Sequence, residues 1–498
     1  MPQTKPNHTL SKSRYTRGIC CHKSLWLLTH CPELREEPDA AHRARFQSGH
    51  EIGELAWRLF PGGTLIPFEN VSLDEQIRLT REAVKTSKVI YEAAFIHDGV
   101  FIKADILRKG RSGWELYEIK SSNGVKDIYQ HDVDVQYYVI AGAGLPVSKA
   151  CSVHLNREYV RDGDLDIQGL FSIVNVTSDT KTRQAGVRKE IGRMKRMLRG
   201  EEPKIDIGPH CGDPYPCDFE GHCWAHIPED SVFDLAGNGV KKFDLYRKGI
   251  IKLEDVPLDS LKGKQRQQAE AALNKKVVVN RKEVREFLDR LWYPLCFLDF
   301  ETFTSAVPLY DGLRPYQQAP FQYSLHYMKK KSGKLHHVEF LAQPGIDPRK
   351  DFLDRMLEDI PEGACVLVYN KSFEIDKLKN LAIQFPRKKK KIQAIIDSIV
   401  DLMEPFQKRS IYSWKQKGSH SIKSVLPAFV SGMSYEGLEI GEGGEAMEAY
   451  HEMCDLVGKP KELVKLRHAL LQYCRQDTLA MVKLLEVLEK KAEVRTKR

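Results

Sequence analysis

The chain has 498 residues, of which 42% are hydrophobic and 29% are charged, and its formal net charge is +9. These proportions are typical of a globular protein with two or three domains, and the excess of Lys and Arg favours an anionic partner. No apolar run approaches the roughly 18 residues of a membrane span, and the N-terminus has no apolar signal segment. These features argue against a membrane protein and predict a cytoplasmic location.

A meander of three strands is predicted in the first third of the chain. Residues 100–107 and 114–119 alternate apolar and polar side chains. The second strand carries Asp105, and the third carries Glu118 and Lys120, which alternation places on one face. Two carboxylates and a lysine at strand ends suit a Mg²⁺ or Mn²⁺ site for phosphodiester hydrolysis. The alternative is that they are ordinary solvent-facing residues of a half-buried sheet.

The order of the elements favours the site. A helix, the meander, a helix at 127–141 and a strand at 150–155 follow one another. This order resembles the PD-(D/E)XK nuclease core, in particular the RecB-type exonucleases associated with CRISPR systems and recombination. The resemblance implies that Asp105 and Glu118 are metal ligands and that Lys120 is the catalytic lysine. It also implies that Gln136 is a helix residue that supports the site. It also implies a metal ligand at His50, for which an ordinary helix-surface histidine is the alternative.

Cysteines form a second pattern. Cys211, Cys217 and Cys223 are equally spaced in a Pro- and Gly-rich stretch, which a bound metal or cluster would hold in place. Zinc ribbons use closer cysteine pairs. RecB-type nucleases of the iron–sulfur class use one cysteine before the core and three after it, so the resemblance implies that Cys21 joins these three around a [4Fe–4S] cluster. Three alternatives are open: a zinc site, free buried cysteines, or ligands among the neighbours Cys20, His22, His210 and His222.

Three further segments are basic or strongly charged. Residues 227–290 predict two or three connector helices, within which 245–257 loosely resembles a helix–hairpin–helix element that binds nucleic-acid backbone. A packed helical linker is the preferred interpretation. The basic stretches 183–199 and 387–391 are either solvated faces or phosphate contacts.

A second group of acids lies in the C-terminal half. The buried-strand pattern at 295–302 places Asp299 and Glu301 on one face. Another buried strand, 364–369, precedes a helix that begins near Asn370 and carries Glu374. The amphipathic helix at 470–488 presents Tyr473 and Asp477 on one face, because they are four residues apart.

These three motifs, in this order, resemble the DEDD-type 3′–5′ exonucleases of the ribonuclease H-like fold, in the tyrosine-containing branch. The resemblance implies that four carboxylates hold two metal ions and that Tyr473 orients the attacking water. The ligands would be Asp299, Glu301, Glu374 and Asp477. Glu374 stands where aspartate is usual, and Asp376 is the alternative ligand. Ser421 and Lys423 are candidate substrate contacts.

Both halves together resemble a bacterial family in which a RecB-like nuclease is fused to an exonuclease-like domain of uncharacterised function. The expected architecture is α/β, with a PD-(D/E)XK domain at 1–226, a helical connector at 227–290 and a ribonuclease H-like domain at 291–498. We expect a metal-dependent nuclease that acts on DNA ends or single strands in repair, recombination or defence. The alternatives are an RNA-processing exonuclease and a non-catalytic nucleic-acid-binding scaffold.

Overall fold

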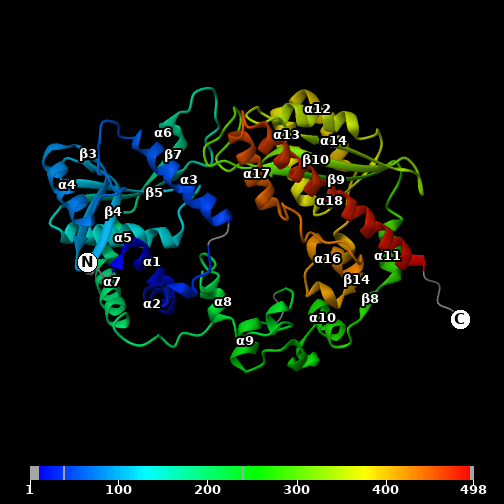
Figure 1. The fold of residues 1–498 in the computed structure, drawn as a ribbon, viewed down its shortest axis with the longest axis horizontal. Coiled ribbons are helices and arrows are strands. Elements are labelled where there is room, and N and C mark those ends of the chain that lie inside the picture. Colours follow the sequence, from blue (N-terminus) through cyan, green and yellow to red (C-terminus); the bar gives the residue numbers. More distant parts are fainter. Residues whose placement is uncertain (1–9, 38–39, 238–240, 494–498) are drawn as a thin grey trace. The chain divides into compact units, whose positions relative to one another are not determined.

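The computed structural model describes residues 10–37, 40–237 and 241–493, with the backbone alone for 40–48. The chain divides into two compact units, Met1–His226 with Ser305–Gln317, and Ile227–Thr304 with Gln318–Arg498. Each unit contains a mixed sheet with helices, so the protein is mixed α/β (Figure 1). The predicted boundaries place residues 305–317 in the C-terminal domain, whereas their contacts place them in the first unit.

The first unit is built on a seven-stranded sheet. Its strands are ordered β2-β3-β4-β5-β6-β7, and β1 pairs with β4. The predicted meander is present as the antiparallel strands β3, β4 and β5. The strands are β1 (Leu10–Ser11), β2 (Thr64–Leu65), β3 (Val89–His97), β4 (Val100–Lys109), β5 (Trp114–Lys120), β6 (Val147–Leu155) and β7 (Phe171–Asn175). The helices are α1 (Lys12–Cys20), α2 (His22–His30), α3 (Ala40–Trp57), α4 (Leu73–Thr86), α5 (Asp127–Gly142), α6 (Ile167–Leu170), α7 (Thr177–Met197) and α8 (Glu220–Cys223).

Local chemistry explains the meander and the crossover that follows it. Asp98 and Gly99 both have positive φ, 46° and 60°, which a tight hairpin turn between β3 and β4 requires. Strands β5 and β6 are parallel, so they need a crossover, and α5 supplies it. Gln136 lies on this crossover helix, and its side chain reaches Glu118 on β5.

Two hydrophobic clusters cover the faces of this sheet. Leu116 belongs to the cluster that includes residues of α4, α5 and α7, while its neighbour Tyr117 belongs to the other cluster, which includes α3. Strand alternation therefore directs Glu118 and Lys120 to the same face as Leu116. Ala306 of the segment Ser305–Gln317 lies in the second cluster, and the Tyr316 hydroxyl donates a hydrogen bond to the carbonyl oxygen of Ser121.

The second unit is built on a five-stranded sheet of order β11-β10-β9-β12-β13. Strands β9, β10 and β11 are antiparallel, and β12 and β13 are parallel to β9. They are β9 (Leu295–Phe303), β10 (Ala319–Met328), β11 (Leu335–Leu341), β12 (Cys365–Val368) and β13 (Ile399–Asp401). The helices beside this sheet are α12 (Arg349–Asp359), α13 (Lys371–Gln384), α14 (Lys389–Asp397), α15 (Glu404–Gln407), α16 (Ile422–Phe429), α17 (Gly443–Asp455) and α18 (Pro460–Glu493).

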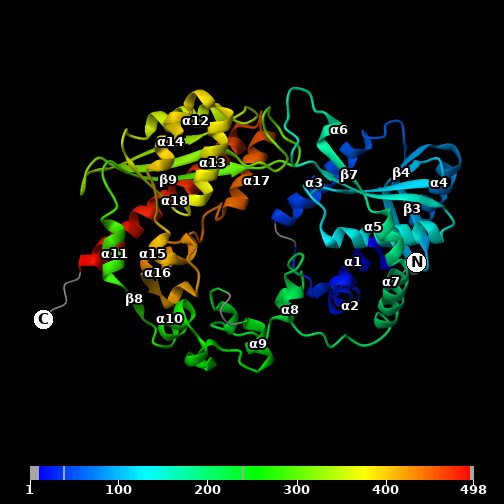
Figure 2. The same cartoon turned by 180° about the vertical axis from the view of Figure 1, so that it is seen from behind.

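Helices cover both faces of the second sheet. Figure 2 shows α12 and α14 on one side of β9 and α18 on the other. The buried residues divide in the same way, because Phe297 of β9 packs in the cluster that includes α18, and Leu298 packs in the cluster that includes α12 and α13. Asp299 and Glu301 follow the alternation of Phe297 and so face α18.

The connector belongs to the second unit and has a small core of its own. Its helices are α9 (Lys242–Arg247), α10 (Gly263–Leu273) and α11 (Arg281–Leu288). Short β8 (Val277–Val279) pairs with β14 (Ile411–Ser413), which the sequence did not indicate. Val232, Leu245 and Leu253 are buried in one cluster, as expected of a packed linker. Among the described residues, no helix combines the length and the apolar character that crossing a bilayer requires.

Candidate active sites and cysteine pocket

The predicted acids of the first unit meet where β4 and β5 separate. The last paired residues of these strands are Ile106 and Tyr117, which are the direct sequence neighbours of Asp105 and Glu118. Beyond this point a side chain replaces the backbone hydrogen bond between the strands. Asp105 Oδ2 accepts a hydrogen bond from the backbone amide of Ile119 at 2.7 Å. Lys120 Nζ lies 2.8 Å from Glu118 Oε1. The structure thus brings Asp105, Glu118 and Lys120 together.

Gln136 reaches the same site from α5. Its amide nitrogen donates to Glu118 Oε2, and its own side chain is fully buried. The other amide atom, Gln136 Oε1, is buried without a hydrogen-bond partner in the described part of the chain. A buried acceptor without a partner is costly, and it is an observation that fits a site built for a further polar group.

Two residues of this site were not anticipated from the sequence. Lys12, the first residue of α1, lies 2.7 Å from Glu118 Oε1 and 3.8 Å from Asp105 Oδ1. Asp132 on α5 pairs with Lys120 and accepts from the Thr16 hydroxyl at 2.7 Å. Asp132 precedes Gln136 by one helical turn, so the i, i+4 rule was a usable signal. The sequence held no comparable signal for Lys12, because the pairing of β1 with β4 and the packing of α1 against α5 bring it there.

The two carboxyl groups of the first site, Asp105 and Glu118, differ in their pKa. Burial, together with the negative charge of Glu118, raises the pKa of Asp105 to about 8. Burial opposes the ionisation of Glu118 too, yet the ammonium groups of Lys12 and Lys120 hold the pKa of Glu118 below its usual range. Glu118 therefore carries the charge near neutral pH, while Asp105 retains a proton that a bound cation would displace.

His50 and Glu92 are peripheral to these contacts. His50 is exposed on α3, and none of the contacts described joins it to Asp105 or Glu118. Glu92 on β3 forms an ion pair with Lys103 at 2.7 Å and adds to the negative field at Asp105. The contacts between described residues thus bring together the two acids, Lys120 and Gln136, and leave His50 outside.

The second group of acids also converges. Asp299, Glu301 and Cys474 each offer a ligand atom, and these atoms all lie within 4.8 Å of one another. Asp477 lies one turn beyond Tyr473 on α18 and accepts hydrogen bonds from two hydroxyls, those of Tyr435 and Tyr473. Tyr435 and Cys474 were not singled out in the sequence. The i, i+3 spacing of Cys474 and Asp477 was a signal for the cysteine, while Tyr435 lies in a loop without a pattern.

Glu374, rather than Asp376, faces this cluster. Glu374 is 1% exposed, and burial together with the charges of Asp401 and Glu301 raises its pKa to about 8. The side chain of Asp376 is 60% exposed and pairs with Lys377 at 2.7 Å. Asp401 fixes the start of α13, because its carboxylate accepts from the backbone amides of Asn370 and Lys371 at 3.0 and 3.1 Å.

Buried acids repel one another in the second site. Burial and the charge of Asp477 raise the pKa of Glu301 to about 8 and also raise the pKa of Asp299. Burial raises the pKa of Asp477 to about 7, although both tyrosines and the Lys423 ammonium favour its charged form. Such a cluster has the carboxylate donors that a divalent cation prefers, and a cation would offset their repulsion.

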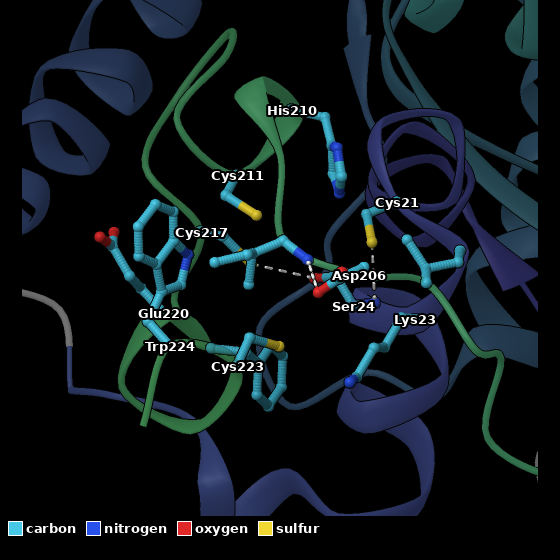
Figure 3. Close-up of a pocket in the computed structure, with 13 residues that line it drawn as sticks. Cys21, Lys23, Ser24, Asp206, His210, Cys211, Cys217, Glu220, Cys223 and Trp224 are labelled. Carbon is cyan, nitrogen blue, oxygen red and sulfur yellow. Dashed lines mark hydrogen bonds between the residues drawn. The ribbon is translucent and has the colours of Figure 1, made fainter. Parts of the chain in front are cut away.

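The four predicted cysteine ligands line one pocket of the first unit. Cys21 is the N-cap of α2, and Cys211, Cys217 and Cys223 come from the loop that ends in α8. Figure 3 shows Cys21 facing Cys211 and Cys223 across the pocket, with His210 at its edge. Of the alternative ligands, His210 lines the pocket, whereas Cys20, His22 and His222 are not among its lining residues.

The spacing of these cysteines bears on which metal group they fit. A single zinc ion would hold four sulfurs about 3.8 Å apart, given Zn–S bonds of about 2.3 Å in a tetrahedron. In the described part of the chain, no three of these cysteines have sulfur atoms that all lie within 4.8 Å of one another. The sulfurs are therefore farther apart than tetrahedral binding of one ion requires.

The cysteine loop also contacts the helices of the first acid site. Arg17 on α1 donates to both oxygens of Asp218, at 2.6 and 2.9 Å, and Asp218 directly follows Cys217. The hydroxyls of Tyr215 and Tyr129 lie 3.1 Å apart, and Lys120 Nζ lies 5.1 Å from the centre of the Tyr129 ring. The loop that carries three of the cysteines thus contacts α1 and α5, which also carry residues of the first acid site.

Comparison with known proteins gives relatives without an assigned activity. A family model described as a domain of unknown function (DUF2779) matches residues 296–421, which include Asp299, Glu301 and Glu374. The chain is 30% identical over 203 residues to the uncharacterized MG366 homolog of Mycoplasma pneumoniae, covering 37% of this chain and 31% of that protein. It is 27% identical over 207 residues to uncharacterized protein MG366 of Mycoplasma genitalium, covering 38% and 31%. The matches thus span about a third of the length of these relatives.

Binding of Mn²⁺ to the first acid site should depend on pH. Because the pKa of Asp105 is raised to about 8, its proton competes with the cation below that pH. We expect the affinity to rise about tenfold per pH unit between about pH 6 and 7.5. Calorimetric titration checks this, with the first site defined as the binding that Asp105→Asn abolishes. An affinity independent of pH would contradict the prediction.

Replacing Lys12 should strengthen cation binding. Lys12→Met removes an ammonium that contacts both Asp105 and Glu118, so we expect the Mn²⁺ affinity of the first site to increase several-fold. Lys195→Met is the matched control, because Lys195 pairs with Asp98 at 2.5 Å, away from these acids. The same titration measures both variants, and an unchanged or weaker affinity in Lys12→Met would be the contrary result.

The cysteine pocket should hold iron. We expect protein purified without oxygen to be brown and to contain iron and acid-labile sulfide, and Cys217→Ser to lose both. Cys31→Ser is the control, because Cys31 is a partly exposed cysteine outside the pocket lining. Colourless wild-type protein with one equivalent of zinc would overturn the assignment.

Proposed function

We propose that this protein is a metal-dependent nuclease that hydrolyses DNA phosphodiesters at ends or in single strands, with a second site of the 3′–5′ exonuclease type. The observation that carries the proposal is the meeting of Asp105, Glu118 and Lys120 where two adjacent strands separate, with Gln136 bonded to Glu118. This is the constellation that the resemblance to RecB-like PD-(D/E)XK nucleases implies.

In the first site, Asp105 and Glu118 would hold Mg²⁺ or Mn²⁺. When bound, such an ion lowers the pKa of a water molecule and offsets the charge of the scissile phosphate. Gln136 fixes the Glu118 carboxylate, and Asp132 holds Lys120 in place by an ion pair. Lys120 can then stabilise the negative charge that develops on the phosphate, as preorganised donors do.

The second site would process 3′ ends. Asp299, Glu301, Glu374 and Asp477 would hold the metal ions, since all four act on one another through their charges or lie within ligand distance. Tyr473 donates to Asp477 and so has a fixed position from which to orient water. The mixed sheet with helices on both faces is compatible with the ribonuclease H-like fold that the sequence resembles.

The iron–sulfur cluster would have a supporting part in this proposal. It would join Cys21, near the beginning of the described chain, to the loop of Cys211, Cys217 and Cys223. The bond between Arg17 and Asp218 and the contact between Tyr129 and Tyr215 connect this loop to α1 and α5, which carry Lys12 and Gln136. Holding the loop would therefore keep those residues at the acids.

A non-catalytic scaffold is the contrasting possibility. A decayed site is expected to lose charged residues first, since buried acids without a partner destabilise the fold. Here the acids of both sites and the lysines of the first are present and mutually oriented. DNA is preferred to RNA on the resemblance alone, so the assay includes both.

End-labelled single- and double-stranded DNA and RNA, incubated with Mg²⁺, Mn²⁺, Zn²⁺ or Co²⁺ without oxygen, test the proposal. We expect Lys120→Ala to lower one cleavage activity about a hundredfold or more, and Asp299→Ala to remove 3′ trimming. Lys195→Ala and Asp376→Ala are the matched controls, because Lys195 pairs with Asp98 and Asp376 pairs with Lys377, outside the two sites. If wild-type protein cleaves none of these substrates, the scaffold is the better description.

A further inference from the structure

A cysteine thiol lies among the carboxylates of the second site. Cys474 is fully buried on α18, and its sulfur is 3.8 Å from Asp299 Oδ2 and 3.7 Å from the Asp299 carbonyl oxygen. Its sulfur and the carboxylate oxygens of Asp299 and Glu301 lie within 4.8 Å of one another. Three donors this close can bind one ion together, because bonds of about 2.0–2.3 Å join a metal to oxygen and sulfur ligands.

The helix directs this thiol into the site. Cys474 and Asp477 are three residues apart on α18 and therefore share the face that covers β9. The other buried cysteines of this sheet, Cys296 and Cys365, lie in hydrophobic clusters. Cys474 differs from them, because carboxylate oxygens of Asp299 and Glu301 lie within 4.8 Å of its sulfur.

An independent observation points to a cation at the same place. Glu374 is 1% exposed, and its Oε2 has no hydrogen-bond partner in the described part of the chain. The charges of Glu374 and Glu301 act on each other, which places the Glu374 carboxylate beside this cluster. A buried carboxylate oxygen without a donor is strongly unfavourable, and a metal ion is a partner that would satisfy it.

We infer that the C-terminal site is a mixed carboxylate–thiol metal site that binds a thiophilic divalent ion, such as Zn²⁺ or Co²⁺, in preference to Mg²⁺. Cys474 is a ligand in this site beside Asp299 and Glu301, and its proton passes to solvent when the metal–sulfur bond forms. Oxygen ligands alone suit Mg²⁺ and Mn²⁺, whereas a thiolate selects softer ions. The inference names the ion of the second site in the proposed function, and it holds whether or not that site cleaves nucleic acid.

Cobalt reports directly on sulfur ligation, because a cobalt–thiolate bond absorbs in the near ultraviolet. The full-length protein is titrated with Co²⁺ without oxygen, and the spectrum of Cys474→Ser is subtracted from that of wild type. Any metal in the cysteine pocket contributes equally to both spectra and cancels. We expect a difference band that saturates at one Co²⁺ per chain, and Zn²⁺ but not millimolar Mg²⁺ should abolish it.

The variants separate a ligand from a structural thiol. Serine keeps a hydrogen-bond donor toward Asp299 but not the soft sulfur, so Cys474→Ser should lose at least tenfold in Zn²⁺ affinity at this site. Cys365→Ser, in the hydrophobic cluster, should behave as wild type. Glu301→Gln removes a different donor and should also weaken the band, which keeps the test valid if Cys474→Ser misfolds.

The outcomes are distinct from those of the nuclease assay. Identical cobalt spectra for wild type and Cys474→Ser, or equal Zn²⁺ affinities, overturn this inference even if the protein cleaves DNA with Mg²⁺. A difference band in a protein without nuclease activity supports the inference and rejects the proposed function.

Discussion

Carboxylates buried next to one another are the constraint on which both halves of this protein depend. Burial and a neighbouring charge raise the pKa of Asp105 in one unit and of Glu301 in the other to about 8. The two units balance this repulsion by different means. The first places the ammonium groups of Lys12 and Lys120 on Glu118. In the second unit, the hydroxyls of two tyrosines donate to Asp477, and the Lys423 ammonium favours its charged form. The second site therefore has fewer ammonium groups in contact with its acids than the first, so more negative charge remains for an added cation to offset.

Secondary structure explains why the acids meet where they do. Asp105 lies where the pairing of β4 and β5 ends, so its side chain is free to take the Ile119 amide. In the second unit Asp299 and Glu301 lie on β9, and α18 crosses the same face with Asp477. In both units a strand supplies the first acids and a helix supplies the residues that fix them. Alternation along the strand and the turn of the helix determine which side chains point inward.

Regular patterns in the sequence predicted the elements well, and contacts between distant segments were not predictable. Strands β4, β5 and β9 and helices α5 and α18 were found from alternation and helical spacing, and with them Glu118, Asp299 and Asp477, while Gln136 was indicated by the resemblance alone. Lys12 was not found, since a two-residue strand places it in the site. Tyr435 lies in a loop, where no period relates position to direction. The preference for Glu374 over Asp376 was decided by burial, which depends on the packing of α13.

The segment Ser305–Gln317 begins two residues after β9 ends, yet its contacts are with the first unit. Ala306 and Tyr316 pack with that unit's second hydrophobic cluster, and Tyr316 bonds to the residue that follows Lys120. A gene truncated after residue 226 would therefore encode a first unit that lacks part of its own packing. Recombination that exchanged either half for a homologous one would have to preserve this insertion. The two halves are therefore expected to have been inherited together.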